Sequence, residues 1–144
     1  MIIESFSSEY TKDVGEKIGY KAKKGHIYCL NGDLGTGKTE FSKGFAKGLL
    51  IKEHITSPTF NIMNIYEGRI PLYHFDVYRI KHIDEMYDTG YEEFFFGNGV
   101  CLIEWSNIIQ ELIPNYAINI NISKDINKGE NYRLIEVSYD SISD

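Results

Sequence analysis

An eight-residue segment, Gly32-Asp-Leu-Gly-Thr-Gly-Lys-Thr39, constrains the fold and the chemistry of this chain more than any other part of it. It matches the pattern G-x-x-x-x-G-K-[ST], whose glycine-rich loop turns backbone N–H groups toward a polyphosphate. In such a loop the lysine, here Lys38, reaches the β- and γ-phosphates, and the hydroxyl of Thr39 binds a magnesium ion. The positive end of the helix that follows also favours an anion. The segment therefore predicts a nucleotide site.

The residues on either side of this loop have the patterns that the loop requires. His26 to Leu30 form a short, mostly apolar run, as a buried strand does. After the loop, Phe41, Phe45 and Leu49 recur every four residues, which is the spacing of one helix face. Strand, loop and helix in this order are the setting of a phosphate-binding loop, so a chance match is disfavoured.

The composition indicates a folded protein with one domain, residues 1–144. Hydrophobic residues make up 42% of the chain, and a chain of this length buries a core of two or three layers. It has no run of 18 apolar residues and no N-terminal leader pattern, so we expect a cytoplasmic protein that does not bind membranes. The net charge of −6 argues against a broad contact with nucleic acid but leaves a local one open.

The remaining segments alternate between strand and helix patterns, which predicts an α/β fold with a mixed β-sheet, flanking helices and added antiparallel strands. Cys29 and Cys101 lack metal-ligand spacing, and we expect both to be buried free thiols. The expected helices begin at Ser7 or Ser8 (ending near Gly19) and lie near 83–87, 91–96 and 108–112. The expected strands are a hairpin at 60–66 and 72–76, a central strand at 100–103, and a terminal antiparallel pair at 116–122 and 132–138.

A phosphate-binding loop needs a second group that holds magnesium, usually a carboxylate at the end of a neighbouring strand. Glu104 follows the unbroken apolar run 100–103, which is typical of a central strand covered on both faces. Asp76 follows a run that polar residues interrupt. We therefore assign magnesium to Thr39 and Glu104, and we expect Asp76 to orient the attacking water or to sense the γ-phosphate.

Three more residues near these carboxylates in the sequence have two interpretations each. Thr59 either brings a hydroxyl to the metal or γ-phosphate from a switch loop, or is an ordinary turn residue. His74 shares a strand face with Asp76, because residues two apart point the same way, but a single strand histidine is more often structural. Trp105 either stacks on a partner or a base, or packs inside the protein.

Four blocks of sequence together resemble a known family. They are Asn31-Gly-Asp-Leu-Gly-Thr-Gly-Lys-Thr39, Thr56-Ser-Pro-Thr-Phe60, Leu72-Tyr-His-Phe-Asp-Val-Tyr-Arg79 and Cys101-Leu-Ile-Glu-Trp105. In content, order and spacing they look like the signature blocks of TsaE, the small bacterial ATPase of tRNA threonylcarbamoyladenosine biosynthesis. The resemblance runs from about Thr11 to Pro114 and extends weakly to Arg133.

The resemblance implies an ATPase that uses ATP and Mg²⁺. It implies work with the threonylcarbamoyl transferase TsaD and its partner TsaB on adenosine 37 of tRNA, so that tRNA is met indirectly. By the same resemblance Glu104 binds magnesium with Thr39, Asp76 supports hydrolysis, and Thr11 and Arg133 lie near the nucleotide. The residues implied to bind its phosphates are Asp33, Leu34, Gly35, Thr36, Gly37, Lys38 and Thr39.

Other nucleotide-binding classes also use such a loop. A GTPase is disfavoured because Asn127-Lys-Gly-Glu130 lacks the final acid of the guanine-reading motif N-K-x-D, and we expect a turn there. A small-molecule kinase needs a lid with arginines, and this chain has three arginines in all. A nucleotide-dependent assembly factor, whose slow hydrolysis resets a complex, stays open. No obvious arginine finger lies near the Thr59 segment, so we expect weak hydrolysis by the isolated protein.

Overall fold

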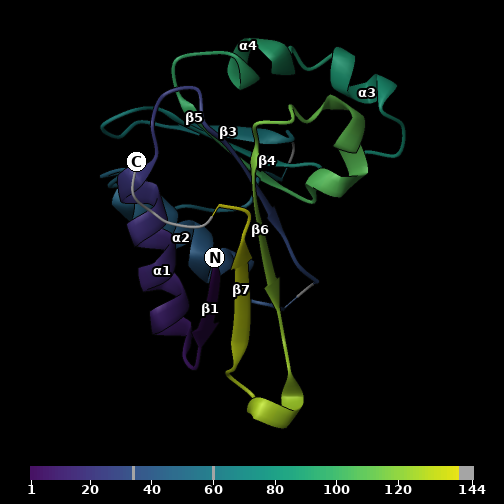
Figure 1. Cartoon of the computed structure of the whole chain (residues 1–144). Coiled ribbons are helices and arrows are strands. Elements are labelled where there is room, and N and C mark those ends of the chain that lie inside the picture. Colours follow the sequence, from purple (N-terminus) through teal and green to yellow (C-terminus); the bar gives the residue numbers. More distant parts are fainter. Residues whose placement is uncertain (34, 60, 140–144) are drawn as a thin grey trace.

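A seven-stranded mixed sheet forms the centre of the structure, in the strand order β1-β7-β6-β2-β5-β4-β3 (Figure 1). The computed structural model describes residues 1–33, 35–59 and 61–139. Strands β6, β2, β5 and β4 run parallel to one another, and β1, β7 and β3 are antiparallel to their neighbours. The strands are β1 (Ile2–Ser5), β2 (Ile27–Asn31), β3 (Met63–Tyr66), β4 (Leu72–Asp76), β5 (Val100–Glu104), β6 (Ile118–Ser123) and β7 (Arg133–Val137).

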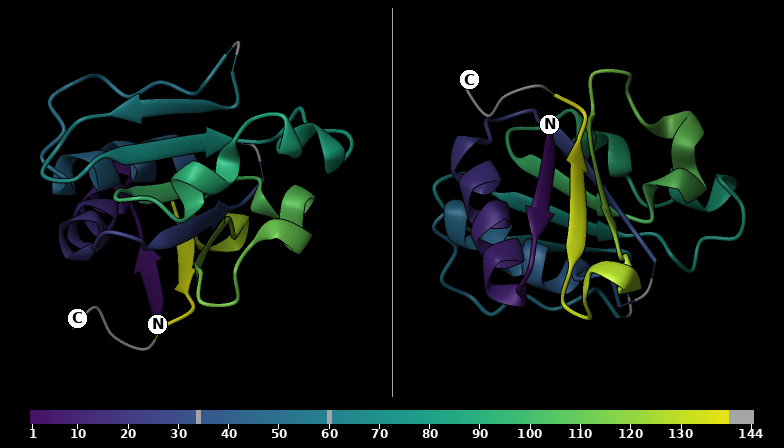
Figure 2. Two further views of the ribbon diagram at one scale, coloured as in Figure 1. Left: turned by 90° about the horizontal axis from the view of Figure 1, so that it is seen from above. Right: turned by 60° about the horizontal axis from the view of Figure 1, so that its bottom comes forward.

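Helices cover both faces of this sheet (Figure 2). On one face lie α1 (Ser8–Lys21) and α2 (Lys38–Gly48), which contribute the apolar residues of one core cluster. On the other lie α3 (Asp84–Tyr87), α4 (Tyr91–Phe95) and the 3-10 helix η1 (Ser106–Leu112). A second 3-10 helix, η2 (Ile126–Lys128), occupies the turn between β6 and β7. The fold is thus three-layered, with the phosphate-binding segment between β2 and α2.

The helices α1 and α2 approach each other closely, and glycines make this possible. A Cβ added to Gly15 of α1 would collide with the carbonyl oxygen of Phe41, and one added to Gly44 of α2 would collide with that of Lys12. The start of α1 is fixed by Ser7, whose Oγ accepts a hydrogen bond of 3.1 Å from the amide of Tyr10. This close pair supports the helix that begins at the phosphate-binding loop.

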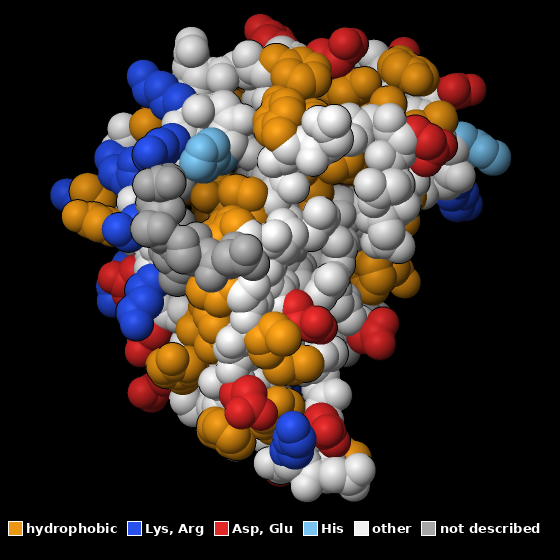
Figure 3. Space-filling view, viewed as in Figure 1, with side chains coloured by type: hydrophobic (Ala, Val, Ile, Leu, Met, Phe, Trp, Pro, Cys, Tyr) orange, Lys and Arg blue, Asp and Glu red, His pale blue; other side chains and the backbone are white. Residues whose placement is uncertain are grey.

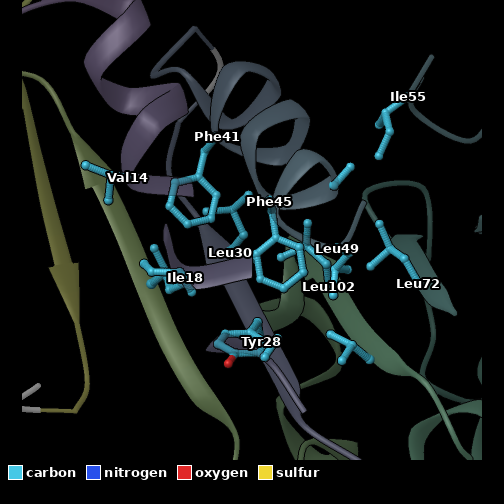
Figure 4. Packing of buried hydrophobic residues seen from close by; sticks show 14 of the residues in the cluster. Val14, Ile18, Tyr28, Leu30, Phe41, Phe45, Leu49, Ile55, Leu72 and Leu102 are labelled. Carbon is cyan, nitrogen blue, oxygen red and sulfur yellow. The ribbon is translucent and has the colours of Figure 1, made fainter. Parts of the chain in front are cut away.

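The apolar spacing seen in the sequence after the loop faces the sheet. Figure 4 shows Phe41 and Phe45 projecting from α2 toward Leu30 of β2 and Leu102 of β5. All four side chains are fully buried. Because large buried side chains of this kind each contribute about 1.5–3 kcal/mol through burial, they hold the start of α2 against the ends of β2 and β5.

The structure confirms most of the expected elements, changes one of them and adds another. The strand β1 was not expected; it pairs with β7 at one edge of the sheet. The expected helix at 108–112 is a 3-10 helix that begins earlier, at Ser106. The expected antiparallel pair at the end of the chain is confirmed as β6–β7, and β6 also pairs with β2. Residue 60, the expected start of β3, lies outside the described residues.

The expectation for the two cysteines is confirmed. Cys29 and Cys101 are buried and free. None of the described helices is long and apolar enough to cross a membrane. In the space-filling view, hydrophobic side chains gather at the top among acidic ones, in the region of α3 and α4 (Figure 3); Tyr87 of α3 and Phe96 after α4 are both more than half exposed.

Candidate nucleotide site

Three parallel strands bring the two predicted carboxylates to the loop. In the register of the sheet, Leu30 of β2 lies opposite Glu104 of β5, and Glu104 lies opposite Asp76 of β4. The loop that leaves β2 therefore begins beside Glu104, with Asp76 one strand further away. Glu104 is buried and Asp76 is about half-buried. Ligands of open α/β sheets bind at this carboxyl end of the strands.

Lys38, the first residue of α2, points back over the loop. Its Nζ donates a hydrogen bond of 2.6 Å to the carbonyl oxygen of Gly32 and lies 3.7 Å from the centre of the Trp105 ring. Burial lowers the pKa of Lys38, and the charges of Glu104, Asp76 and Asp33 oppose this shift. The ammonium is thus a nearly buried cation whose nearest charges are the site carboxylates.

Two glycines of the loop have a left-handed backbone conformation. Gly35 and Gly37 have φ angles of 77° and 101°, a region that residues with a side chain rarely adopt. The hydroxyl of Thr36 donates 2.7 Å to the carbonyl oxygen of Asp33, which closes the turn. Thr39, the second residue of α2, is exposed next to Lys38. Leu34, also predicted to bind phosphate, lies outside the described residues.

The structure places Thr11 and Arg133 beside the loop, although both are far from it in sequence. A Cβ on Gly37 would lie 3.8 Å from Cγ2 of Thr11 and 3.9 Å from Nε of Arg133. Arg133 donates from Nε to the carbonyl oxygen of Thr36, at 2.9 Å, and from Nη2 to that of Gly35, at 3.4 Å. Thr11 is buried and bonded through its hydroxyl to that of Ser5, at 2.8 Å. Their roles toward a nucleotide stay a prediction.

Trp105 packs against the site from the end of β5. Its φ of 62° is left-handed, an unusual conformation for a bulky residue that the surrounding contacts must hold. Asn31 provides one such contact, because its Oδ1 accepts hydrogen bonds of 3.1 Å from the amide and the hydroxyl of Ser106. The indole meets Lys38 and also the ring of Tyr78, with centroids 4.8 Å apart. Trp105 thus packs on residues of the site, and its stacking on a partner or a base stays a prediction.

Sequence reasoning missed the position of Arg79. Its Nη1 donates a hydrogen bond of 2.7 Å to the carbonyl oxygen of Thr59, so this arginine lies beside the segment 56–59. That no arginine finger acts there stays a prediction. The signal was present in the short spacing from Asp76 to Arg79 at the end of a strand. The antiparallel pairing of β3 with β4 places the start of β3 beside the end of β4, and the segment 56–59 leads into that start.

A second omission is the partner of Glu104. His74 of β4 places Nε2 2.7 Å from Oε2 of Glu104, and both side chains are buried. The pair results from the parallel register of β4 and β5, in which His74 lies two residue pairs before Asp76 and Glu104. The expectation that His74 is a hydrogen-bonded strand residue is met, and its partner is the predicted magnesium ligand.

The surroundings of Asp76 disfavour the charged form of its carboxylate. Burial raises its pKa, and the charge of Glu104 adds to the rise. The amide of Tyr78, which donates 3.0 Å to Oδ1, opposes the shift, as do the nearby His74 and Lys38. A carboxylate in this position favours proton or cation uptake.

Two hollows meet at Trp105. The larger, about 720 Å³, lies between the loop residues Gly32 and Thr36 and the end of β6, with Asn121 and Lys124 on its wall. The smaller, about 380 Å³, is lined by Thr59, Asp76 and Arg79. Both volumes are within the range of small-molecule sites.

The donor set suits magnesium bound together with phosphates. Among the described residues, no group of three or more His, Cys, Asp or Glu side chains is placed to hold a metal ion. Magnesium in nucleotide sites is usually held by one or two carboxylates, waters and phosphate oxygens, and hard oxygen donors are what Glu104, Asp76 and Thr39 offer. The residues present therefore fit the ion.

Comparison with known proteins identifies the family of this chain. A family model described as threonylcarbamoyl adenosine biosynthesis protein TsaE matches residues 5–133. The chain belongs to the TsaE family. The tRNA threonylcarbamoyladenosine biosynthesis protein TsaE of Bacillus subtilis (strain 168) is 47% identical over 117 residues, which are 81% of this chain and 73% of that protein. The protein of the same name from Treponema pallidum is 42% identical over 118 residues, covering 82% and 87%.

A solved structure supports the fold as well as the family. The crystal structure of Bacillus subtilis YdiB matches with a TM-score of 0.76 and 39% identity, covering 94% of this chain and 82% of that one. The TsaE resemblance inferred from the four sequence blocks is thereby confirmed, as is the α/β fold with a mixed sheet. The TsaE family is a family of tRNA threonylcarbamoyladenosine biosynthesis.

Proposed function

We propose that this chain is a Mg²⁺-dependent ATPase of the cytoplasm that supports the threonylcarbamoyl modification of adenosine 37 in tRNA, together with TsaB and TsaD. One observation carries the ATPase part of the proposal: Lys38, Glu104 and Asp76 converge beside a loop with the G-x-x-x-x-G-K-[ST] sequence. The biosynthetic part rests on membership of the TsaE family.

Each side chain has one task in this mechanism. Lys38 leaves the carbonyl of Gly32 and binds the β- and γ-phosphate oxygens, and the loop amides hold the remaining oxygens. Glu104 and Thr39 hold Mg²⁺, which when bound neutralises charge on the transferring phosphoryl group. Asp76 lies at the neighbouring strand end, where its carboxylate orients the attacking water.

The two hollows suggest where the rest of the substrate lies. The larger hollow takes the base and ribose, because it opens beside Gly32 and Thr36 and offers the Asn121 amide for hydrogen bonds. The smaller hollow takes the γ-phosphate end, because Asp76 lines it. A nucleotide that occupies both hollows lies beside Trp105, which lines each of them, and beside the loop.

A second function, that of a nucleotide-dependent assembly factor, is favoured by the bond between Arg79 and Thr59. This bond ties the segment 56–59 to the strand end that carries Asp76. Tyr66 and Asn64 hold the other end of the segment, at Thr56. The end at Thr59, held by the exposed bond from Arg79, is thus the end that rearranges when a γ-phosphate arrives or leaves, as switch loops do. ATP hydrolysis then resets a complex with TsaB and TsaD, and the two functions act in one protein.

The test is reconstitution of the tRNA modification with purified TsaB and TsaD, tRNA, ATP and the other components of the reaction, with and without this chain. Repeated turnover should require the chain, and Lys38→Ala should not replace it. Phosphate release should also fall by about 100-fold or more in Lys38→Ala and Thr39→Ala, since both remove phosphate or metal contacts. The matched control is Lys43→Ala, a lysine of α2 paired with Glu40 on the surface. Equal modification with and without the chain would refute the proposal.

A further inference from the structure

Glu104 and His74 form a buried pair between neighbouring strands. Nε2 of His74 is 2.7 Å from Oε2 of Glu104, and only 1% of His74 and 6% of Glu104 is exposed. An ionised carboxylate can only accept a hydrogen bond, so Nε2 carries the proton and donates it. A buried carboxylate without a donor is costly, and His74 supplies this donor.

The other imidazole nitrogen of His74 shows that packing alone does not explain the residue. Nδ1 is buried and has no hydrogen-bond partner among the described residues. Unpartnered buried polar atoms are rare and unfavourable, so an apolar side chain would suit this environment better. Leu72, two residues earlier on the same strand face, is such a side chain and is fully buried. We therefore attribute the presence of an imidazole at this position to the hydrogen bond that it donates to Glu104.

Lys38 is the other group that stabilises Glu104, through its charge. It is a long, flexible side chain, and in the proposed mechanism it turns toward the phosphates. His74, by contrast, lies within β4 between two paired strands and keeps its place. Glu104 thus retains only His74 as a fixed partner when a nucleotide binds.

We propose that His74 is a positioning residue, whose Nε2–H holds Oε2 of Glu104 and leaves the second carboxylate oxygen for the magnesium ion. The inference rests on the proposed function, in which Glu104 is a ligand of that ion. Hydrogen bonds to metal ligands fix their orientation, and their removal typically weakens metal binding by about 10–100-fold. His74 contributes in the same way, without contact with the ion.

Two amide substitutions separate this role from packing. In His74→Gln the side-chain amide nitrogen reaches the place of Nε2, and in His74→Asn the same amide is too short to reach Glu104. Both variants are polar, and we expect them to lower the free energy of unfolding by similar amounts. Binding of Mn²⁺, used as the probe for Mg²⁺, is measured on each protein loaded with ADP by electron paramagnetic resonance. ADP affinity in EDTA and thermal unfolding of the nucleotide-free protein are measured in parallel, with His82→Gln, an exposed histidine, as the control.

His74→Asn should weaken Mn²⁺ binding by about 10-fold or more, His74→Gln by less than about 3-fold, and ADP affinity in EDTA should be unchanged in both. Equal Mn²⁺ affinity in His74→Asn and the unchanged protein would overturn the inference. So would equal losses in His74→Gln and His74→Asn, because shape rather than the donor would then matter. If the unchanged protein binds neither ADP nor Mn²⁺, the proposed function fails too; if it binds both and only the His74 result is negative, the proposed function stands.

Discussion

Lys38 and Trp105 are in direct contact, with the lysine Nζ 3.7 Å from the centre of the indole ring. The same Nζ donates to the carbonyl oxygen of Gly32. A cation on an aromatic face gains about 0.5–2 kcal/mol, and a hydrogen bond from a charged donor gains about 1.5–3 kcal/mol. In the proposed function Lys38 turns toward the phosphates and gives up both contacts, so we expect the ring and the ammonium to separate when a nucleotide binds.

This contact makes Trp105 an internal reporter, because it is the only tryptophan in the chain. We expect ATP to change its fluorescence emission, since the charge next to the ring moves away. Lys38→Ala should show an altered spectrum before ATP is added and little change afterwards. Titration with ATP measures both effects, and Lys43→Ala should behave like the unchanged protein. An identical spectrum at all ATP concentrations would contradict the movement.

The bond between Arg79 and Thr59 predicts a change in local mobility. Arg79→Ala removes the 2.7 Å bond to the carbonyl of Thr59, so the segment 56–59 should open more often. Hydrogen exchange should become about 5- to 10-fold faster in peptides that cover this segment, while β2 and β5 stay protected. Arg79→Lys keeps a donor and should restore part of the protection. Unchanged exchange in Arg79→Ala would mean that other contacts hold the segment.

We predict that the Asp76 carboxylate lowers the stability of the folded protein at neutral pH, although hydrolysis requires it. Because burial and Glu104 raise its pKa, the folded protein holds a proton that the unfolded chain has released at pH values just above the ordinary carboxyl range. The free energy of unfolding therefore falls as the pH rises through that window and stays lower above it.

Asp76→Asn should remove this loss and stabilise the nucleotide-free protein at pH 7 by about 0.5–1 kcal/mol, while it abolishes hydrolysis. Urea unfolding at pH 7 and pH 4.5 measures the effect, which should shrink at the lower pH. The exposed Asp88, changed to Asn, serves as the control. A variant less stable than the unchanged protein at pH 7 would show that the bond from the Tyr78 amide dominates.

The sequence was sufficient for the parts of the site that depend on local pattern. The run before Glu104 is apolar on both faces, and the strand it predicted is the fully buried β5. The motif located Lys38 and Thr39 at the start of α2, because glycine-rich loops of this pattern lead into a helix.

Contacts that depend on strand register were beyond the sequence. His74 meets Glu104 only because β4 and β5 pair in parallel with His74 opposite Leu102, and pairing between segments 30 residues apart leaves no local signal. The strand β1 escaped detection for a related reason. It has four residues, and its partner β7 lies at the opposite end of the chain.

Arg69 supplies the last prediction, which concerns the fold rather than the site. Its Nη2 lies 2.7–2.8 Å from the carbonyl oxygens of Gly19, Tyr20 and Ala22, at the end of α1. The last carbonyls of a helix lack partners within it, and a cation there also favours the helix dipole. Arg69→Ala should therefore lower the free energy of unfolding by about 1.5–3 kcal/mol, as measured in urea.

The same substitution should leave ATP affinity unchanged, because Arg69 lies in the turn between β3 and β4, away from the loop. Arg69→Lys should recover part of the loss, since the ammonium keeps the charge and the donors but sits on a shorter side chain that lacks the planar guanidinium. Lys21→Ala, at the exposed last turn of α1, is the matched control and should cost less than about 0.5 kcal/mol. If Arg69→Ala lowers the free energy of unfolding no more than Lys21→Ala does, then water satisfies the carbonyl groups at the end of α1 as well as the arginine does.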